Sequence, residues 1–265
     1  MASFDVVGSR EKAVAIVEVP AAARRKAKGI AAEIMRKHKN VRSVLLKSSP
    51  RKGVYRTRKL KLVAGGKNTE VLHIEHGMRF LLDPKKVYFS PREATERQRV
   101  AAMVQEGEFV MVFFAGVGPL AIAAAKMAKA QRVIGIELNP DAVRYFRKNV
   151  KLNKVTNVEV VKGDVKEKAR RFYGMCDRVV MPLPEKAAAY LEDAIRCVRP
   201  SGVVHLYCFS KDEDIGRVKD TVKSIAAQLK RKVRFGEVQH VLPYAPRVWK
   251  CRVDFTVHEK AARKI

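Results

Sequence analysis

The chain has 265 residues, of which 55 are Lys or Arg and 27 are Asp or Glu, so its formal net charge at pH 7 is +28. This excess of positive charge is larger than solubility requires, and it predicts a polyanionic partner such as a nucleic acid. No run approaches the roughly 18 apolar residues of a membrane-spanning helix, so we expect no membrane association. A basic, solvated thermophile surface is the alternative, although such surfaces mix both signs of charge more evenly.

The chain start and the cysteines both favour a cytoplasmic protein. The first five residues lack the basic start and apolar core of a signal peptide. The four cysteines, Cys176, Cys197, Cys208 and Cys251, form no C-x-x-C pair and have no histidine at ligand spacing. We therefore expect buried, reduced thiols, no metal site and, with no motif for assembly, a monomer.

Periodicity predicts a small α+β module over residues 1–86, to which we assign RNA binding. Its expected elements are a strand at 13–19, a helix from Pro20 to about residue 37, and strands at 41–46, 55–63, 70–76 and 78–82.

Residues 87–265 predict a linker helix followed by a Rossmann-like α/β domain. The linker helix is expected to start at 90–92, followed by a strand at 109–114 and an Ala-rich helix at 120–130. Strands at 133–138 and 158–161 then flank a basic helix, and a strand at 177–181 and a helix at 187–198 follow. The domain is expected to end with a strand at 203–209, a helix at 214–230 and a closing antiparallel pair at 233–241 and 247–257.

Three segments of this domain predict a nucleoside site. Gly116 and Gly118 form a turn without side chains after the first strand, so a ligand can approach bare backbone there. Glu137 ends the next strand, where a carboxylate can accept hydrogen bonds from both ribose hydroxyls. Asp164 ends the strand after that and can hold an adenine amino group. The alternative is a generic glycine turn with surface acids.

The identity of the cofactor depends on the acids more than on the glycines. The third glycine of a dinucleotide fingerprint is replaced by Ala121, which is an allowed variant. Glu137-Leu138-Asn139-Pro140, a basic helix and then Asp164 are typical of S-adenosylmethionine sites, because this donor has no phosphate and needs carboxylates instead. Val112 stands where such enzymes often carry an acid, so contacts to the methionine end must come from elsewhere.

Three other groups could carry chemistry, and each has a plainer alternative. Tyr55-Arg56-Thr57-Arg58 could equally be a strand with an exposed basic face. Tyr88 to Arg92, followed by Glu96-Arg97, could be a helix start with a surface ion pair. Met181-Pro182-Leu183-Pro184 lies where amino-methylating enzymes grip the acceptor nitrogen, and could be a proline-stiffened strand exit.

Together these motifs resemble the archaeal and eukaryotic tRNA (guanine-37 N1)-methyltransferases, from about residue 5 to residue 257. In two respects the chain departs from that family: members usually carry a further N-terminal domain that reads the tRNA elbow, and their Asn-Leu-Pro motif is here Pro182-Leu183-Pro184. The motifs that carry the resemblance are Asp5-Val6-Val7-Gly8, Gly53-Val54-Tyr55-Arg56-Thr57-Arg58, Tyr88-Phe89-Ser90-Pro91-Arg92, Glu96-Arg97, Phe114-Ala115-Gly116-Val117-Gly118-Pro119 and Asn139-Pro140.

The resemblance implies methyl transfer from S-adenosylmethionine to guanosine 37 in the anticodon loop of tRNA. Guanine N1 carries a proton at neutral pH, so its methylation needs a base and a cation beside O6. By similarity, Glu96 is the base, Arg56 is the cation and Pro182 lies at the catalytic site. The implied cofactor-binding residues are Tyr88, Arg92, Phe114, Ala115, Gly116, Gly118, Glu137, Leu138, Asp164, Val165 and Pro182.

Pro182 keeps other activities open, because proline offers no hydrogen-bond donor to the base. It resembles the archaeal wyosine-pathway subgroup, some members of which also methylate C7 of the tricyclic wyosine precursor. A related branch transfers the aminocarboxypropyl group of the same cofactor. A non-catalytic RNA-binding protein and a methyltransferase acting on protein or small molecules are the alternatives from other classes.

Overall fold

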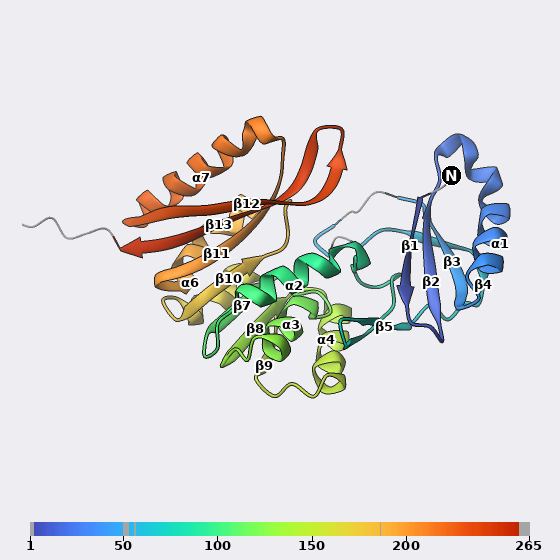
Figure 1. Ribbon diagram of the computed structural model, residues 1–265, viewed down its shortest axis with the longest axis horizontal. Coiled ribbons are helices and arrows are strands. Elements are labelled where there is room, and N and C mark those ends of the chain that lie inside the picture. The colour runs from blue at the N-terminus through green and yellow to red at the C-terminus, as the bar shows by residue number, and fades with distance from the viewer. Residues whose placement is uncertain (1–2, 50–52, 56, 186, 260–265) are drawn as a thin grey trace, which may run out of the picture. The chain divides into compact units, whose positions relative to one another are not determined.

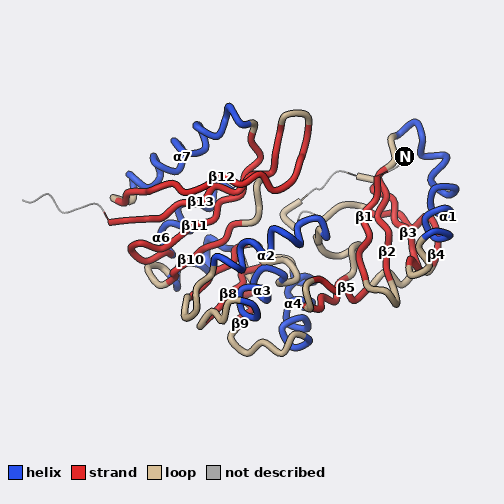
Figure 2. The backbone as a smooth tube through the Cα atoms, in the orientation of Figure 1, coloured by secondary structure: helices blue, strands red, loops and turns tan. Residues whose placement is uncertain are grey.

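The structure is a computed structural model that describes residues 3–49, 53–55, 57–185 and 187–259 (Figures 1 and 2). The chain divides into two compact units that are interleaved in sequence. The first unit comprises Met1–Ala94, Gly116–Gly118 and Asn139–Lys154, and the second comprises Thr95–Ala115, Pro119–Leu138 and Val155–Ile265. The domain boundary expected between residues 86 and 87 stays a prediction.

The first unit contains a four-stranded sheet in the order β1-β2-β3-β4 (Figure 1). Strands β2 and β3 are parallel, and the 3-10 helix η1 and helix α1 connect them. Ala27, Ala31 and Ile34 are buried at helical spacing on α1 and pack against the sheet. The elements are β1 (Ser3–Gly8), β2 (Ala13–Glu18), η1 (Ala21–Lys26), α1 (Ala27–Lys37), β3 (Val41–Lys47) and β4 (Leu60–Gly65).

The expectations for this sheet were wrong in two respects. The strand expected over residues 55–63 begins only at Leu60, because its partner β3 ends at Lys47, the residue that pairs with Leu60. Strand β1 was not expected at all. It is an edge strand with only Val7 buried, so its sequence lacks a clear apolar alternation.

A hairpin of β5 (Val71–Glu75) and β6 (Met78–Leu82) completes the first unit together with helix α4 (Pro140–Leu152). The hairpin turn, His76-Gly77, has positive φ at both positions, which is the geometry of a type I′ turn. Asn149 of α4 and Asn153, the residue that caps its end, bond to the backbone of β6: Asn149 pairs with both polar groups of Leu81, and Asn153 with those of Arg79. These bonds tie α4 to the hairpin.

The second unit is built on a seven-stranded sheet in the order β12-β13-β11-β10-β7-β8-β9. The five strands from β11 to β9 are parallel, whereas β13 runs antiparallel to β11 and β12 antiparallel to β13. This arrangement confirms the expected Rossmann-like fold with a closing antiparallel pair. The strands are β7 (Phe109–Phe113), β8 (Arg132–Glu137), β9 (Val158–Lys162), β10 (Cys176–Met181), β11 (Val198–Ser210), β12 (Arg231–Ala245) and β13 (Val248–Glu259).

Helices cover both faces of this sheet, and successive residues on a strand face opposite sides. Val204, Leu206, Phe255 and Val257 belong to the apolar core that also contains the buried residues of α6 and α7. The opposite face of the same strands bonds to α2, as described below. Helix α2 (Ala94–Met103) follows the 3-10 turn η2 (Pro91–Glu93) of the first unit. The other helices are α3 (Pro119–Met127), α5 (Val165–Lys168), η3 (Ala169–Phe172), η4 (Ala187–Tyr190), α6 (Leu191–Cys197), η5 (Asp212–Asp214) and α7 (Ile215–Gln228).

The four cysteines are buried and unpaired, as expected. Burial raises the pKa of the Cys176 and Cys208 thiols to about 12, so both are protonated near neutral pH. Within the described ranges, no helix combines the length and the apolar character needed to cross a membrane.

Candidate active site

The carboxyl ends of four parallel strands meet at one edge of the sheet in the second unit. In such sheets this edge is where ligands bind. The Ala115 amide, just after β7, donates to the Ile136 carbonyl on β8 at 3.0 Å, and the Gly163 amide after β9 donates to the Glu137 carbonyl at 3.0 Å. Seven predicted site residues lie at these strand ends: Phe114, Ala115, Glu137, Leu138, Asp164, Val165 and Pro182.

The turn after β7 has an unusual backbone. Phe114 has a φ of 52°, which is strained for a bulky side chain and occurs mostly at functional turns. Gly116 and Gly118 have φ of 59° and 90°. A Cβ atom on Gly118 would lie 2.0 Å from the Phe146 ring, whereas one on Gly116 would find no other atom closer than 3.9 Å. Gly118 is therefore required by packing, whereas a side chain at Gly116 would meet no close neighbour.

Asp164 and Phe114 both neighbour Tyr190, a residue that the sequence did not single out. The Phe114 and Tyr190 rings form an edge-to-face pair with centroids 4.8 Å apart. Burial, and next the charge of Asp164, raise the pKa of Tyr190. One Asp164 oxygen also caps α5 by accepting from the Lys166 amide at 2.8 Å, so part of its role is structural. Tyr190 follows three alanines, a context that gives no site signal.

The residues at this edge fit the nucleoside part of S-adenosylmethionine. Glu137 and Asp164 are half-buried carboxylates on adjacent strands, the chemistry that ribose hydroxyls and an adenine amino group require. The aromatic pair supplies an apolar wall. Pro182 follows β10 directly and is half-buried. Val112 is buried within β7, two residues before the turn.

Glu96 lies in the first turn of α2 and is only 4% exposed. Its Oε1 accepts hydrogen bonds from the Tyr207 hydroxyl at 2.6 Å and from Arg252 Nη1 at 2.5 Å. Among the described residues, Oε2 has no hydrogen-bond partner, and Arg99 Nη1 lies 3.7 Å from it. Arg97 is equally buried. The alternative of a surface ion pair at this helix start was therefore wrong.

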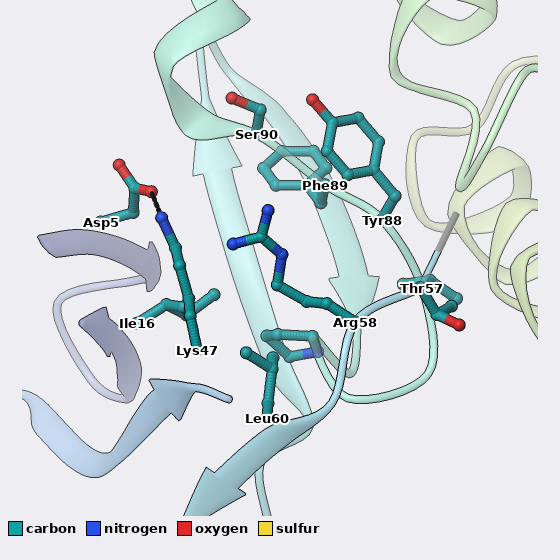
Figure 3. A pocket seen from close by; sticks show the side chains of 11 residues that line it. Asp5, Ile16, Lys47, Thr57, Arg58, Leu60, Tyr88, Phe89 and Ser90 are labelled. Carbon is teal, nitrogen blue, oxygen red and sulfur yellow. Dashed lines mark ion pairs between the residues drawn. The ribbon is translucent and has the colours of Figure 1, made fainter. Parts of the chain in front are cut away.

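The first unit holds the remaining predicted residues. Tyr88 donates its hydroxyl proton to Glu93 at 2.9 Å, and Arg92 Nε donates to Asp5 at 2.5 Å. A pocket of about 510 Å³, counting its open side, lies beside Tyr88, and Figure 3 shows the Arg58 guanidinium pointing into it. Arg56 lies outside the described residues. The pocket is lined by Asp5, Ile16, Lys47, Thr57, Arg58, Leu60, Pro84, Val87, Tyr88, Phe89 and Ser90.

Comparison with known proteins agrees with this fold. Residues 71–234 match the TRM5/TYW2 methyltransferase domain, and residues 1–69 match the TYW2 N-terminal domain. The tRNA (guanine(37)-N(1))-methyltransferase Trm5b of Pyrococcus abyssi is 43% identical over 96% of this chain and 74% of its own length. The tRNA(Phe) (4-demethylwyosine(37)-C(7)) aminocarboxypropyltransferase of Methanocaldococcus jannaschii is 33% identical over 84% of this chain and 88% of its own.

Two solved structures extend the likeness. A complex of aTrm5 and tRNALeu superposes with a TM-score of 0.82 at 32% identity, covering 96% of this chain and 71% of that one. Methanocaldococcus jannaschii TYW2 in complex with AdoMet superposes with a TM-score of 0.76 at 27% identity, covering 97% of this chain and all of that one. The fold and the strand-end site define an α/β methyltransferase. The chain belongs to the TRM5/TYW2 methyltransferase family, which confirms the expected resemblance.

Proposed function

We propose that the protein transfers a methyl group from S-adenosylmethionine to N1 of guanosine 37 in tRNA. The observation that carries the proposal is the Glu96 carboxylate, which is buried and whose Oε2 has no hydrogen-bond partner among the described residues. A base for guanine N1 must have an oxygen that can accept the proton. The name of the Pyrococcus relative and the net charge of +28 support the same conclusion.

Each residue has an assigned role in this reaction. S-adenosylmethionine supplies a methyl group bound to a positively charged sulfur. Glu96 Oε2 accepts the N1 proton as the bond from N1 to the methyl carbon forms and the sulfur–carbon bond breaks. Arg56 is assigned to the negative charge that develops on O6. The target base must first leave its stack in the anticodon loop, at a cost of a few kcal/mol.

We assign the cofactor roles from the chemistry of the residues at the strand ends and from the family resemblance. Glu137 is assigned to the ribose and Asp164 to the adenine, with Phe114, Ala115, Gly116, Gly118, Leu138 and Val165 as their surroundings. Tyr88 and Arg92 are assigned by resemblance to the methionine end.

Pro182 favours a second candidate function, the transfer of a methyl or aminocarboxypropyl group to C7 of the wyosine precursor. Its ring nitrogen has no proton, so this strand end cannot donate a hydrogen bond to guanine as an asparagine would. The aminocarboxypropyltransferase relative shows that the fold supports such chemistry in another protein. Carbon alkylation at C7 and nitrogen methylation at N1 leave different products.

One experiment separates these candidates. The protein is incubated with tRNA transcripts carrying G37 or A37 and, in a second arm, with tRNA carrying 4-demethylwyosine, each with S-adenosylmethionine labelled in the methyl group. Digested nucleosides are then identified by mass spectrometry. We expect labelled 1-methylguanosine from G37 tRNA only. An added mass at C7 without N1 methylation would favour the second candidate. A calorimetric titration showing no donor binding at millimolar concentration would instead support a non-catalytic RNA-binding protein.

The partner and location follow from the same proposal. We infer that the anticodon loop of tRNA is the substrate and that the protein acts in the cytoplasm as a monomer. Affinity for tRNA should fall steeply as salt increases, since contacts between basic residues and phosphates release counterions. Light scattering of the purified protein, alone and with tRNA, measures the stoichiometry.

A further inference from the structure

Glu96 is one end of a continuous chain of buried polar side chains that crosses three strands of the second unit. Tyr207 on β11 is directly opposite Arg252 on β13, and His205 is directly opposite Asp254. Residues two apart on a strand share a face, so all four lie on the same face of the sheet. The apolar core with α6 and α7 occupies the other face.

The hydrogen bonds in this chain also fix the protonation of its histidine. Arg252 Nη1 donates to Glu96 at 2.5 Å, and its Nε donates to both oxygens of Asp254 at 2.9 and 3.1 Å. Arg178 Nη1 lies 2.7 Å from His205 Nε2. A guanidinium can only donate, so Nε2 must accept. The His205 ring is therefore neutral, and its Nδ1 donates to Asp254 at 2.6 Å.

The far end of the chain holds the other end of α2. Arg178 forms two parallel bonds to Glu108 at 2.7 and 2.8 Å, and its Nη2 also donates to the Met103 carbonyl at 2.8 Å. Met103 is the last residue of α2, whereas Glu96 lies in its first turn. The helix is thus tied to the sheet at both ends by charged groups.

We propose that Tyr207 and Arg252 are positioning residues that orient the Glu96 carboxylate for proton abstraction, which rests on the proposed function. Their two donors occupy Oε1 and leave Oε2 as the accepting oxygen. Arg99 Nη1, 3.7 Å from Oε2, is beyond hydrogen-bond distance and belongs to a half-exposed side chain. The geometry thereby selects which oxygen of the base reacts.

A purely structural role accounts poorly for this arrangement. Burying an ion pair costs desolvation, and an apolar contact of similar volume often holds two elements together as well or better. The opposite face of β11 and β13 packs in that apolar way. A charged arrangement is needed where a carboxylate must be fixed in one orientation.

The test begins with Tyr207→Phe, which removes one donor and keeps the ring. We expect the single-turnover rate of methyl transfer to fall about ten-fold, since a hydrogen bond to a charged group is lost, while the dissociation constants for tRNA and for S-adenosylmethionine change by less than about two-fold. Tyr173→Phe is the matched control, because the Tyr173 hydroxyl also donates to a carboxylate, Asp193, at 2.7 Å. The control should keep the wild-type rate.

A double-mutant cycle separates positioning from general damage. In the Glu96→Gln background, measured with enzyme in excess, Tyr207→Phe should cost less than about two-fold, because its effect passes through the carboxylate that has been removed. An undiminished loss in that background would overturn the proposal. The proposal would also be overturned if Tyr207→Phe had the wild-type rate while Glu96→Gln was slow. That result would leave the proposed function standing. A wild-type rate for Glu96→Gln would overturn the positioning proposal and the base role of Glu96, and would leave methyl transfer to N1 standing.

Arg252 gives an independent arm. Arg252→Gln should slow transfer more than Tyr207→Phe does, because a charge is lost together with the donor to Oε1. Arg252→Lys restores the charge, and we expect it to recover part of the rate at unchanged tRNA affinity. If Arg252→Gln and Arg252→Lys slow methyl transfer to the same extent and lower the melting temperature to the same extent, Arg252 only holds the fold together. The positioning role is then overturned.

Discussion

The two faces of strands β11 and β13 present opposite solutions to the same packing problem. On one face, Leu206 and Phe255 pack into an apolar core that extends to α6 and α7. On the other, Tyr207 and Arg252 bond to the single carboxylate of Glu96 on α2. Neighbouring residues of the same two strands therefore serve stability on one side and the geometry of the proposed base on the other.

This difference teaches where to expect function in the sheet. Burial of apolar side chains is favourable wherever it occurs, so the apolar face needs no particular partner. Buried charges are favourable only when each partner is correctly placed, so the polar face tolerates few changes. Changes on the two faces should accordingly affect different measured quantities.

The largest effect should come from Glu96→Gln. The amide cannot take the N1 proton, although it can still accept from Tyr207 and Arg252, so we expect the rate of methyl transfer to fall by about 10²–10⁴ while donor binding persists. Single-turnover kinetics and calorimetric titration with S-adenosylmethionine measure the two quantities. Glu192→Gln, the same change at an exposed carboxylate paired with Arg196 on α6, is the control. Equal rates for both variants would remove Glu96 from the base role.

The reverse pattern should follow from Leu206→Ala on the apolar face. Leu206 is 3% exposed, so truncation leaves a cavity, and we expect the free energy of unfolding to fall by about 2–5 kcal/mol. The rate of methyl transfer should stay near the wild-type value at temperatures where the variant is folded. Leu152→Ala, at a 40% exposed leucine, should cost well under about 1 kcal/mol in the same denaturant titrations. A specific loss of rate in Leu206→Ala would erase the contrast between the faces.

The apolar strands of the second unit are the part of the molecule that its sequence predicts well. Continuous apolar runs such as 109–113 and 133–136 have few alternatives to a strand. All seven strands of the second unit were expected, although β11 begins five residues before its expected start and β12 ends four residues after its expected end. Strand β1 and the start of β4 were missed because an edge strand and a basic loop carry no strong periodicity.

The polar face could not be predicted in the same way. The alternations His205-Leu206-Tyr207 and Arg252-Val253-Asp254 are visible in the sequence, but they are also what a solvent-exposed strand face looks like. Only the tertiary fold shows that these residues are buried. Glu96 bonds to residues 111 and 156 positions further along the chain, and no local pattern encodes such partners.

A smaller effect should appear at the strand-end edge that borders both faces. We expect Glu137→Ala and Asp164→Ala each to weaken S-adenosylmethionine binding about ten-fold, in keeping with the loss of a hydrogen bond to a charged group. Asp164→Asn sharpens the test, because asparagine still caps α5. A loss of affinity in Asp164→Asn without a change in melting temperature would assign the effect to the ligand. Wild-type affinity in all three variants would mean that the site is misplaced.

The smallest effect concerns the protonation of His205 in the middle of the polar face. Burial lowers its pKa, and the guanidinium groups of Arg178 and Arg252 act in the same direction, against the hydrogen bond to Asp254. The unfolded chain therefore binds this proton more readily than the folded protein, so the contribution to stability is complete above about pH 6.5 and is lost as the pH falls below it.

His205→Gln should flatten the dependence of the unfolding free energy on pH between about pH 7.5 and about pH 5.5, because glutamine does not titrate and its amide can still donate to Asp254. Asp254 does not confound this window. Although burial alone would raise the pKa of Asp254, the hydrogen bonds from His205 and Arg252 hold that pKa below its usual range. The stability that is lost when Asp254 is protonated is therefore lost at lower pH. Denaturant titrations across the pH range measure the slope. An unchanged slope would mean that His205 gains no proton affinity on unfolding, which is incompatible with Arg178 donating to an unprotonated Nε2.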